Sequence, residues 1–294
     1  MEGIRRDNEA LDNIINDPEE PTFENTIART DTSKGEHYYD LLDRVSTVFS
    51  CMLSAETNDQ LDQLAQKLSP ILTRHANDVA LNSRLFARIK HVYEHHRPPT
   101  PDEQMLPNNP YDKDKLRQLT EEASLLSLQF SQNLLKETKA YELHITDEAQ
   151  LDGLPDTARE AAATAAKEKG KEGWIFTLDS PRYSPFMTYS TQHQLRREMH
   201  RQHSTRCTHD NDYCNLAICE RLVNLRREVA QLLGYQTYAD YVLEHRMAGN
   251  TGRVYQLLHD LIAAYKPTAL EERAEIEALA KRLEGDDFVL EPWD

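Results

Sequence analysis

The sequence is poor in glycine and contains no long apolar segment. Its nine glycines among 294 residues argue against a glycine-rich phosphate-binding loop and against a turn-rich β-sandwich. No apolar run approaches the roughly 20 residues needed to cross a bilayer, and the N-terminus lacks the apolar core of a secretory signal. We therefore expect neither a membrane-spanning segment nor a membrane partner.

Cysteine is also scarce. The four cysteines, Cys51, Cys207, Cys214 and Cys219, do not follow the spacing of a disulfide framework. Reduced thiols are the default for such a pattern, and they indicate a cytoplasmic protein. An exported protein whose signal peptide has been removed stays open as the alternative.

Basic residues are in deficit. The chain has 34 Lys and Arg against 50 Asp and Glu, which gives a formal net charge of −16. A surface of this charge repels the phosphates of nucleic acids. The densest basic segment contains Arg196, Arg197, Arg201 and Arg206, but acidic residues flank it and no aromatic stacking pattern accompanies it. We interpret it as a solvated helix face and expect no nucleic-acid partner.

Residues that favour helices dominate the composition of the chain. Apolar residues recur at helical spacing along most of the chain, between segments rich in Glu, Lys, Arg and Gln. This pattern predicts a mainly α fold. The predicted helices cover residues 1–16, 38–53, 59–72, 83–93, 112–139, 156–169, 191–206 and 211–233, and two more begin at Thr237 and Thr251.

Capping residues and prolines refine these boundaries. The segment Thr57–Asp59 stands where an N-cap is expected, and Thr191 with Gln194 has the spacing of a capping box. Pro70 and Pro267 lie inside predicted helices, so we expect a bend at each.

One segment, residues 173–190, interrupts the helical pattern. Trp174, Ile175 and Phe176 favour a strand, and the segment from Phe186 to Ser190 reads as a second one. Two prolines and two serines between them predict a loop. We expect a short strand pair that braces two helical layers, and we divide the chain there into residues 1–172 and 173–294.

The sharpest local motif is H-x-x-E-H, formed by His91, Glu94 and His95. On a helix the two histidines would share a face, as zinc ligands must, and the glutamate could act as a base. The motif also ends a predicted helix before Pro98, where histidines favourably meet the negative end of the helix dipole. We prefer this second interpretation.

A second group, Cys207, His209, Cys214 and Cys219, falls within thirteen residues. Its spacings match no zinc-binding pattern, so buried or free thiols are the better interpretation. His200 and His203 are helical neighbours without a third ligand and should lie on the surface.

The chain has no H-E-x-x-H, G-x-S-x-G, Walker A or G-x-G-x-x-G motif. We therefore assign no catalytic, cofactor-binding or metal-binding residue.

Taken together, several stretches resemble the thimet oligopeptidase (M3) family of zinc metallopeptidases, on the side of the bacterial peptidyl-dipeptidases and oligopeptidase A. Each stretch is short, but they follow one another in order over nearly the whole chain. They are residues Pro21–Ile27, Leu85–Tyr93, Leu151–Pro155, Gly173–Ser190, Leu225–Tyr235, Tyr238–Tyr241, Arg246–Ala248 and Pro292–Asp294. Residues 28–39 and 105–112 depart from the family pattern, so we expect different loop geometry there.

The resemblance implies a large, mostly helical enzyme with a deep channel, in which zinc on an H-E-x-x-H helix activates the water that attacks a peptide bond. Since this chain contains no such motif, we expect it to be the N-terminal portion of such a peptidase, inactive and free of zinc on its own. The parent would cleave short peptides, either by removing C-terminal dipeptides or by internal cleavage. A complete, non-enzymatic helical interaction protein is the alternative from a different class. The oligomeric state is left open.

Overall fold

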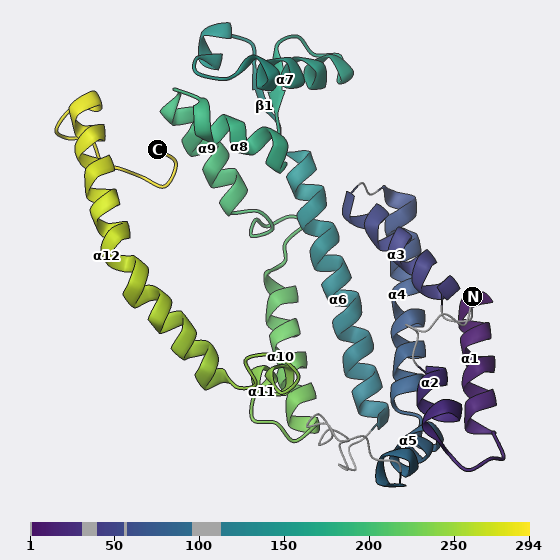
Figure 1. Ribbon diagram of the computed structural model, residues 1–294. Coiled ribbons are helices and arrows are strands. Elements are labelled where there is room, and N and C mark those ends of the chain that lie inside the picture. The colour runs from purple at the N-terminus through teal and green to yellow at the C-terminus, as the bar shows by residue number, and fades with distance from the viewer. Residues whose placement is uncertain (1, 31–39, 56–57, 96–112) are drawn as a thin grey trace. The chain divides into compact units, whose positions relative to one another are not determined.

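The computed structural model describes residues 2–30, 40–55, 58–95 and 113–294 (Figure 1). Helices dominate these residues, and two short strands form one antiparallel sheet. The predicted mainly α fold is thus confirmed. No helix in the described residues is long and apolar enough to cross a membrane.

The chain divides into two compact units. One comprises residues 1–128 with 222–236, and the other comprises residues 129–221 with 237–294. Two helices, α6 (Lys113–Ala140) and α10 (Leu216–Leu232), contribute residues to both units.

The first unit packs its helices around a small apolar cluster. Leu11, Ile14 and Ile15 of one helix meet Leu85 of another. Polar contacts add to this packing: Arg88 Nη1 donates to the carbonyl of Asp17 at 2.8 Å. The elements of this unit before α6 are α1 (Glu2–Ile15), a π-helical turn η1 (Phe23–Ile27), α2 (Ala28–Thr30), α3 (Asp40–Ala55), α4 (Asp59–Ala80) and α5 (Ser83–His95).

The predicted helix boundaries hold in part. Asn58 Oδ1 accepts from the backbone N–H groups of Gln60 and Leu61, as an N-cap should. The predicted capping box at Thr191 is wrong: α9 (His193–Ser204) has Gln192 at its N-cap and no side-chain cap. Thr191 Oγ1 instead donates to Asp152 Oδ2 at 2.9 Å, a partner 39 residues earlier in the chain.

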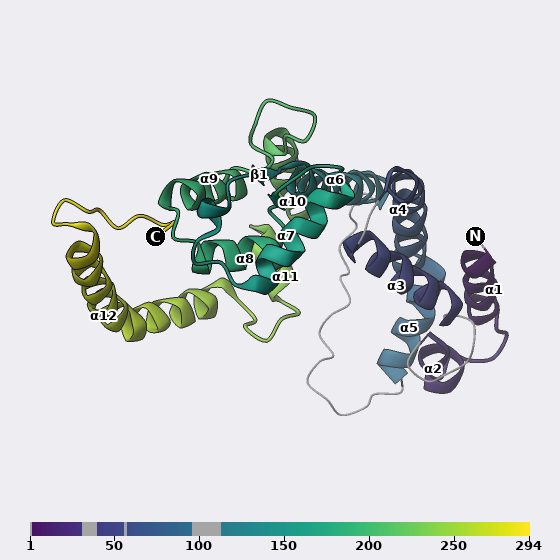
Figure 2. The same cartoon turned by 90° about the horizontal axis from the view of Figure 1, so that it is seen from above.

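The second unit is built around the two-stranded sheet. Strand β1 (Leu143–Ile145) pairs with β2 (Trp174–Phe176) in the register Leu143 to Phe176 and Ile145 to Trp174. Helix α7 (Asp156–Glu168) packs on β2, α8 (Ser180–Tyr189) packs on both β2 and α7, and α9 packs on α8. Figure 2 shows these three helices from above. The other elements of the unit are a 3₁₀ turn η3 (Glu148–Leu151), α11 (Tyr238–Leu243) and α12 (Thr251–Glu284).

The second strand predicted for residues 186–190 is wrong, because that segment ends helix α8. The carbonyl of Asp179 accepts from the N–H groups of Arg182 and Tyr183, which starts the helix. Pro181 lies in the first turn, where a missing N–H removes no helical hydrogen bond. Phe186 is completely buried against Phe176, with ring centroids 4.8 Å apart. This burial overrides the β-propensity of the segment.

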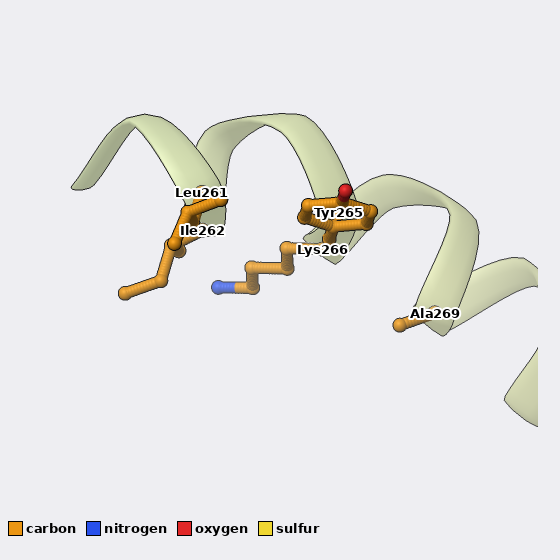
Figure 3. Close-up of a pocket in the computed structure, with 5 residues that line it drawn as sticks. All are labelled: Leu261, Ile262, Tyr265, Lys266 and Ala269. Atoms are coloured by element: carbon orange, nitrogen blue, oxygen red, sulfur yellow. The ribbon is translucent and has the colours of Figure 1, made fainter. Parts of the chain in front are cut away.

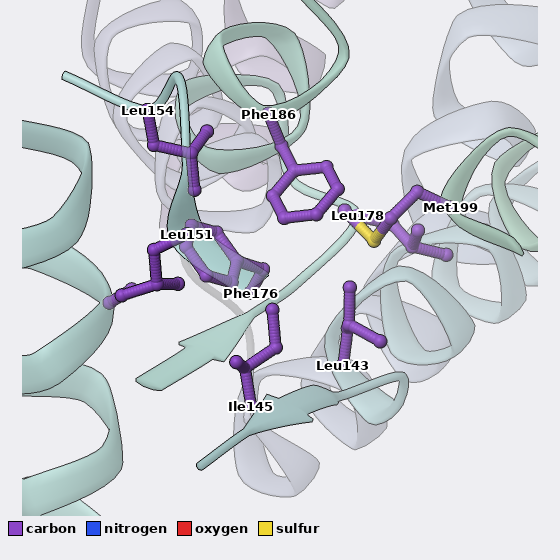
Figure 4. Close-up of a cluster of buried hydrophobic side chains, with 9 residues drawn as sticks. Leu143, Ile145, Leu151, Leu154, Phe176, Leu178, Phe186 and Met199 are labelled. Atoms are coloured by element: carbon purple, nitrogen blue, oxygen red, sulfur yellow. The ribbon is translucent and has the colours of Figure 1, made fainter. Parts of the chain in front are cut away.

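The core of this unit lies between the sheet and the helices that cover it (Figure 4). It draws residues from six consecutive elements and the loops between them. Its buried members are Leu143, Ile145, Leu151, Leu154, Ala162, Phe176, Leu178, Phe186 and Met199. The segment 173–190 therefore acts as a structural brace, although its strand partner lies outside that segment.

Candidate functional site

Three groups of polar side chains in the described residues were candidates for chemistry, and each lies within one unit. The first is the H-x-x-E-H motif at the end of α5. The rings of His91 and His95 are stacked, 4.2 Å apart with planes at 17°. His95 Nδ1 donates to the carbonyl of His91 at 2.9 Å, while His91 Nε2 lies 3.2 Å from Glu20 Oε1. Glu94 lies 3.6 Å from Lys90 Nζ. These contacts suit histidines at a helix C-terminus.

The second group is the loop between α9 and α10, which the carboxylate of Glu137 on α6 holds in place. This carboxylate accepts from the backbone N–H of Cys207, from His209 Nδ1 at 3.2 Å and from Asn211 Nδ2 at 3.1 Å. Burial alone would raise the pKa of Glu137, but these hydrogen bonds outweigh burial and lower it.

The environment of Cys207 in this loop disfavours its thiolate form. Cys207 is buried and has a φ of 58°. Burial, followed by its hydrogen bond to Glu137, raises the pKa of the Cys207 thiol to about 12. A thiol with so high a pKa is neither a nucleophile nor a ready metal ligand at neutral pH. Cys214 is half-buried and Cys219 is exposed on α10.

The loop also explains why α10 begins at Leu216 rather than at residue 211. Asn215 Nδ2 donates to the carbonyl of Phe130 at 3.0 Å, and its Oδ1 accepts from Asn133 Nδ2 at 2.9 Å. Its backbone N–H donates to the carbonyl of Cys207 at 2.8 Å. These bonds hold the preceding residues in turns.

The third group joins α9 to the segment after α12, and sequence analysis missed it. Arg196 is buried, with 8% exposure, so its assignment to a solvated helix face is wrong. Its Nε donates to the carbonyl of Trp293 at 2.7 Å, its Nη1 donates to the carbonyl of Ser190, and its Nη2 donates to Asp294 Oδ1 at 3.1 Å. We call Arg196, His193, Trp293 and Asp294 the α9 clamp.

The remaining contacts of the α9 clamp are electrostatic and aromatic. His193 Nδ1 lies 2.7 Å from Asp294 Oδ1, and its Nε2 lies 3.5 Å from Glu284 Oε1. Burial alone would raise the pKa of Asp294, but hydrogen bonds from His193, from the N–H of Glu291 and from Arg196 lower it. The guanidinium of Arg197 lies 5.4 Å from the centre of the Trp293 ring.

His203, predicted to lie on the surface, is partly buried. Its ring stacks on Tyr183 of α8 at 4.1 Å, and its Nε2 lies 2.9 Å from Arg206 Nη2. Burial lowers the pKa of His203, and the charges of Arg206 and His200 add to this effect. The pair ties α8 to α9.

Comparison with known proteins relates the chain to one family. Residues 186–294 match the model of Peptidase family M3. Dipeptidyl carboxypeptidase of Escherichia coli (strain K12) is 31% identical over 309 residues, an alignment that includes 100% of this chain and 44% of that protein. The chain is similar to peptidases of family M3.

Two further relatives agree with this similarity to the M3 peptidases. Oligopeptidase A of Salmonella typhimurium (strain LT2) is 32% identical over 274 residues, which are 87% of this chain and 40% of the relative. Probable cytosolic oligopeptidase A of Arabidopsis thaliana is 33% identical over 192 residues, which are 62% of this chain and 27% of the relative. The chain thus spans less than half the length of the M3 relatives that it matches.

The M3 match includes the whole α9 clamp and excludes the H-x-x-E-H motif of α5. In the described residues, no group of three or more His, Cys, Asp or Glu is placed to hold a metal ion. His95 commits one ring nitrogen to a backbone carbonyl, and the Cys207 thiol keeps its proton. These side chains do not fit a catalytic metal, so we assign no reaction step to one held by this chain.

Proposed function

We propose that the chain forms the N-terminal part of a zinc metallopeptidase that hydrolyses short peptides. The observation that carries this proposal is the similarity of the entire chain to dipeptidyl carboxypeptidase of E. coli. The chain itself contributes helical scaffold and the braced core around Phe176 and Phe186. When bound elsewhere in the enzyme, zinc would activate the water that attacks the peptide carbonyl.

Removal of C-terminal dipeptides is the finer activity that we propose. The match to dipeptidyl carboxypeptidase extends over 100% of this chain, whereas that to oligopeptidase A of S. typhimurium extends over 87%. Internal cleavage of oligopeptides is the alternative within the same family. We further propose a cytoplasmic enzyme without nucleic-acid or membrane partners, because the chain is acidic and its cysteines follow no disulfide pattern.

The test begins with the gene. We expect the reading frame to continue past Asp294 and to encode an H-E-x-x-H motif. The extended protein, purified with zinc, should release the C-terminal dipeptide from an N-blocked peptide, and a zinc chelator should abolish this release. Products of internal cleavage would favour the oligopeptidase alternative.

A non-enzymatic helical interaction protein is the second candidate, and the exposed apolar residues of α12 favour it. A stop codon directly after Asp294, together with a purified chain that binds another protein and hydrolyses no peptide, would support that candidate and contradict the peptidase.

A further inference from the structure

Helix α12 carries an apolar stripe that the rest of its own unit leaves uncovered. We call this set the α12 stripe, and its members recur three or four residues apart on either side of Ala269. In the described structure no residue of α12 is buried, and the members of the stripe are 43–73% exposed. They are Leu258, Leu261, Ile262, Tyr265, Ile276, Leu279 and Leu283.

The opposite side of α12 is different in character. It carries Gln256, Asp260, Glu271 and Lys281. A helix with one apolar and one polar side is typical of a helix that buries its apolar side. The pattern therefore predicts that the apolar side of α12 packs against a partner surface and is not exposed to water.

The size of the stripe supports this expectation. At 1.5 Å per residue a helix of 34 residues is about 50 Å long, and with a diameter of about 10 Å its apolar side has an area on the order of 500 Å². Monomeric proteins rarely expose more than a few hundred Å² of contiguous apolar surface. Figure 3 shows the central part, where Leu261, Ile262, Tyr265, Lys266 and Ala269 line a hollow. Because one helix supplies this whole lining, it fits a macromolecular surface better than a small ligand.

We propose that the α12 stripe is the docking surface for the part of an M3 peptidase polypeptide that lies outside the region matched by this chain. This inference rests on the proposed function. The family match includes all of α12, and yet the chain covers only 44% of the length of dipeptidyl carboxypeptidase of E. coli. The relatives therefore possess additional polypeptide that can cover this helix.

The charges of α12 describe the complementary surface. Glu272 lies within the stripe, one turn before Ile276, while Lys266 and Arg273 border it. A partner should present apolar side chains with a basic residue opposite Glu272 and acidic residues opposite Lys266 and Arg273. A second copy of this chain fits less well, because pairing would join two chains of charge −16 each.

Co-expression tests this docking. The tagged 294-residue chain is produced together with the part of E. coli dipeptidyl carboxypeptidase that lies outside the alignment. We expect a one-to-one complex in size-exclusion chromatography with light scattering. The double variant Ile262→Glu and Tyr265→Glu should weaken it at least tenfold. The matched control, Ala263→Glu with Ala274→Glu on the polar side of α12, should bind as the unchanged chain does. Circular dichroism checks that all variants are folded.

Two outcomes overturn the inference. The first is that the folded chain forms no complex, or that both double variants bind as well as the unchanged chain. The second is that the chain forms a dimer with itself, which the Ile262→Glu and Tyr265→Glu variant dissociates, while no mixed complex forms. This experiment measures complex formation and does not depend on peptide hydrolysis, so it can fail independently of the proposed function. The complex could depend on the α12 stripe even if the gene encodes no H-E-x-x-H motif. That result would contradict the proposed function but still support the α12 stripe as a docking surface.

Discussion

At the scale of single residues, Arg196 shows how one buried cation organises a segment far away in the chain. Its side chain is 10% exposed and that of Asp294 is 7% exposed. Removing one partner of a buried ion pair leaves the other without compensation. The neighbouring Arg197 is exposed and lies over the ring of Trp293, so it provides a matched control.

We expect Arg196→Met to lower the free energy of unfolding by about 3 kcal/mol. Arg197→Met should lower it by no more than about 1 kcal/mol, since an exposed cation–π contact is weak. Urea unfolding of both variants measures the difference. Equal losses would show that the α9 clamp does not hold the segment in place.

This pair also marks a limit of sequence reasoning. Arg196 and Arg197 are adjacent and chemically identical, and the acidic neighbours gave no reason to separate them. Their environments differ because residues 291–294 return to α9 from about a hundred positions further along the chain. A local sequence pattern cannot predict a contact between residues so far apart in the chain. Glu137, which anchors the Cys207 loop, was missed for the same reason.

Gly173 permits the close approach of the two strands. It has a φ of +87°, and a Cβ there would lie 2.3 Å from the carbonyl oxygen of Ile145. Gly170 has a φ of +65° and no atom within 4 Å of such a Cβ. Both positions strain an alanine, but only Gly173 adds a backbone clash.

Gly170→Ala should therefore cost about 1 kcal/mol of stability, and Gly173→Ala should cost about 3 kcal/mol or more because of the clash. Thermal unfolding of the two variants compares them. Similar melting temperatures would contradict the pairing of β1 with β2 at this register.

His203 predicts a pH dependence of stability. Burial lowers its folded-state pKa below 6.5, so the folded protein favours the neutral ring. Its contribution is present above pH 6.5 and is lost as the pH falls below that value, because the unfolded chain then binds the proton more readily. We expect the free energy of unfolding to fall as the pH drops below 6.5. His203→Gln should flatten this slope, and an unchanged slope would exclude His203 as its source.

At the scale of elements, helical periodicity predicted most of the helices, because most of them bury one apolar side. Strand pairing was harder to predict. Trp174–Phe176 was recognised as a strand because Trp, Ile and Phe all favour strands. Its partner Leu143–Ile145 is equally short, and only its isoleucine is a strong strand former, so it was missed. Residues 186–190 had strand-like composition and became helical because helix α8 places Phe186 in the core.

Substitutions in the second half of α8 test whether this segment is a helix. Phe186→Ala should lower the free energy of unfolding by about 3–5 kcal/mol, as expected for a buried aromatic side chain. Tyr189, which is 54% exposed, should tolerate alanine within about 0.5 kcal/mol. If 186–190 were instead a half-buried strand, Phe186 and Tyr189 would face opposite sides of it, and Thr188→Ala would share the loss seen for Phe186→Ala.

At the scale of the whole molecule, the family followed from short stretches in the right order rather than from any catalytic motif. The residues of the two candidate metal motifs make other contacts. His91 and His95 stack on one another, the buried Cys207 thiol keeps its proton, and Glu137 holds the loop that contains Cys207. We propose that the chain contributes to a peptidase both a braced helical scaffold and the α12 stripe on which further polypeptide docks.

Our central proposal is that this chain is part of a peptidase whose catalytic groups lie outside it. The most direct measurement is the release of C-terminal dipeptides from an N-blocked peptide by the purified 294-residue chain in the presence of zinc. We predict no release above the rate without protein. Turnover by the chain, abolished by a chelator and accompanied by one bound zinc per chain, would contradict the claim.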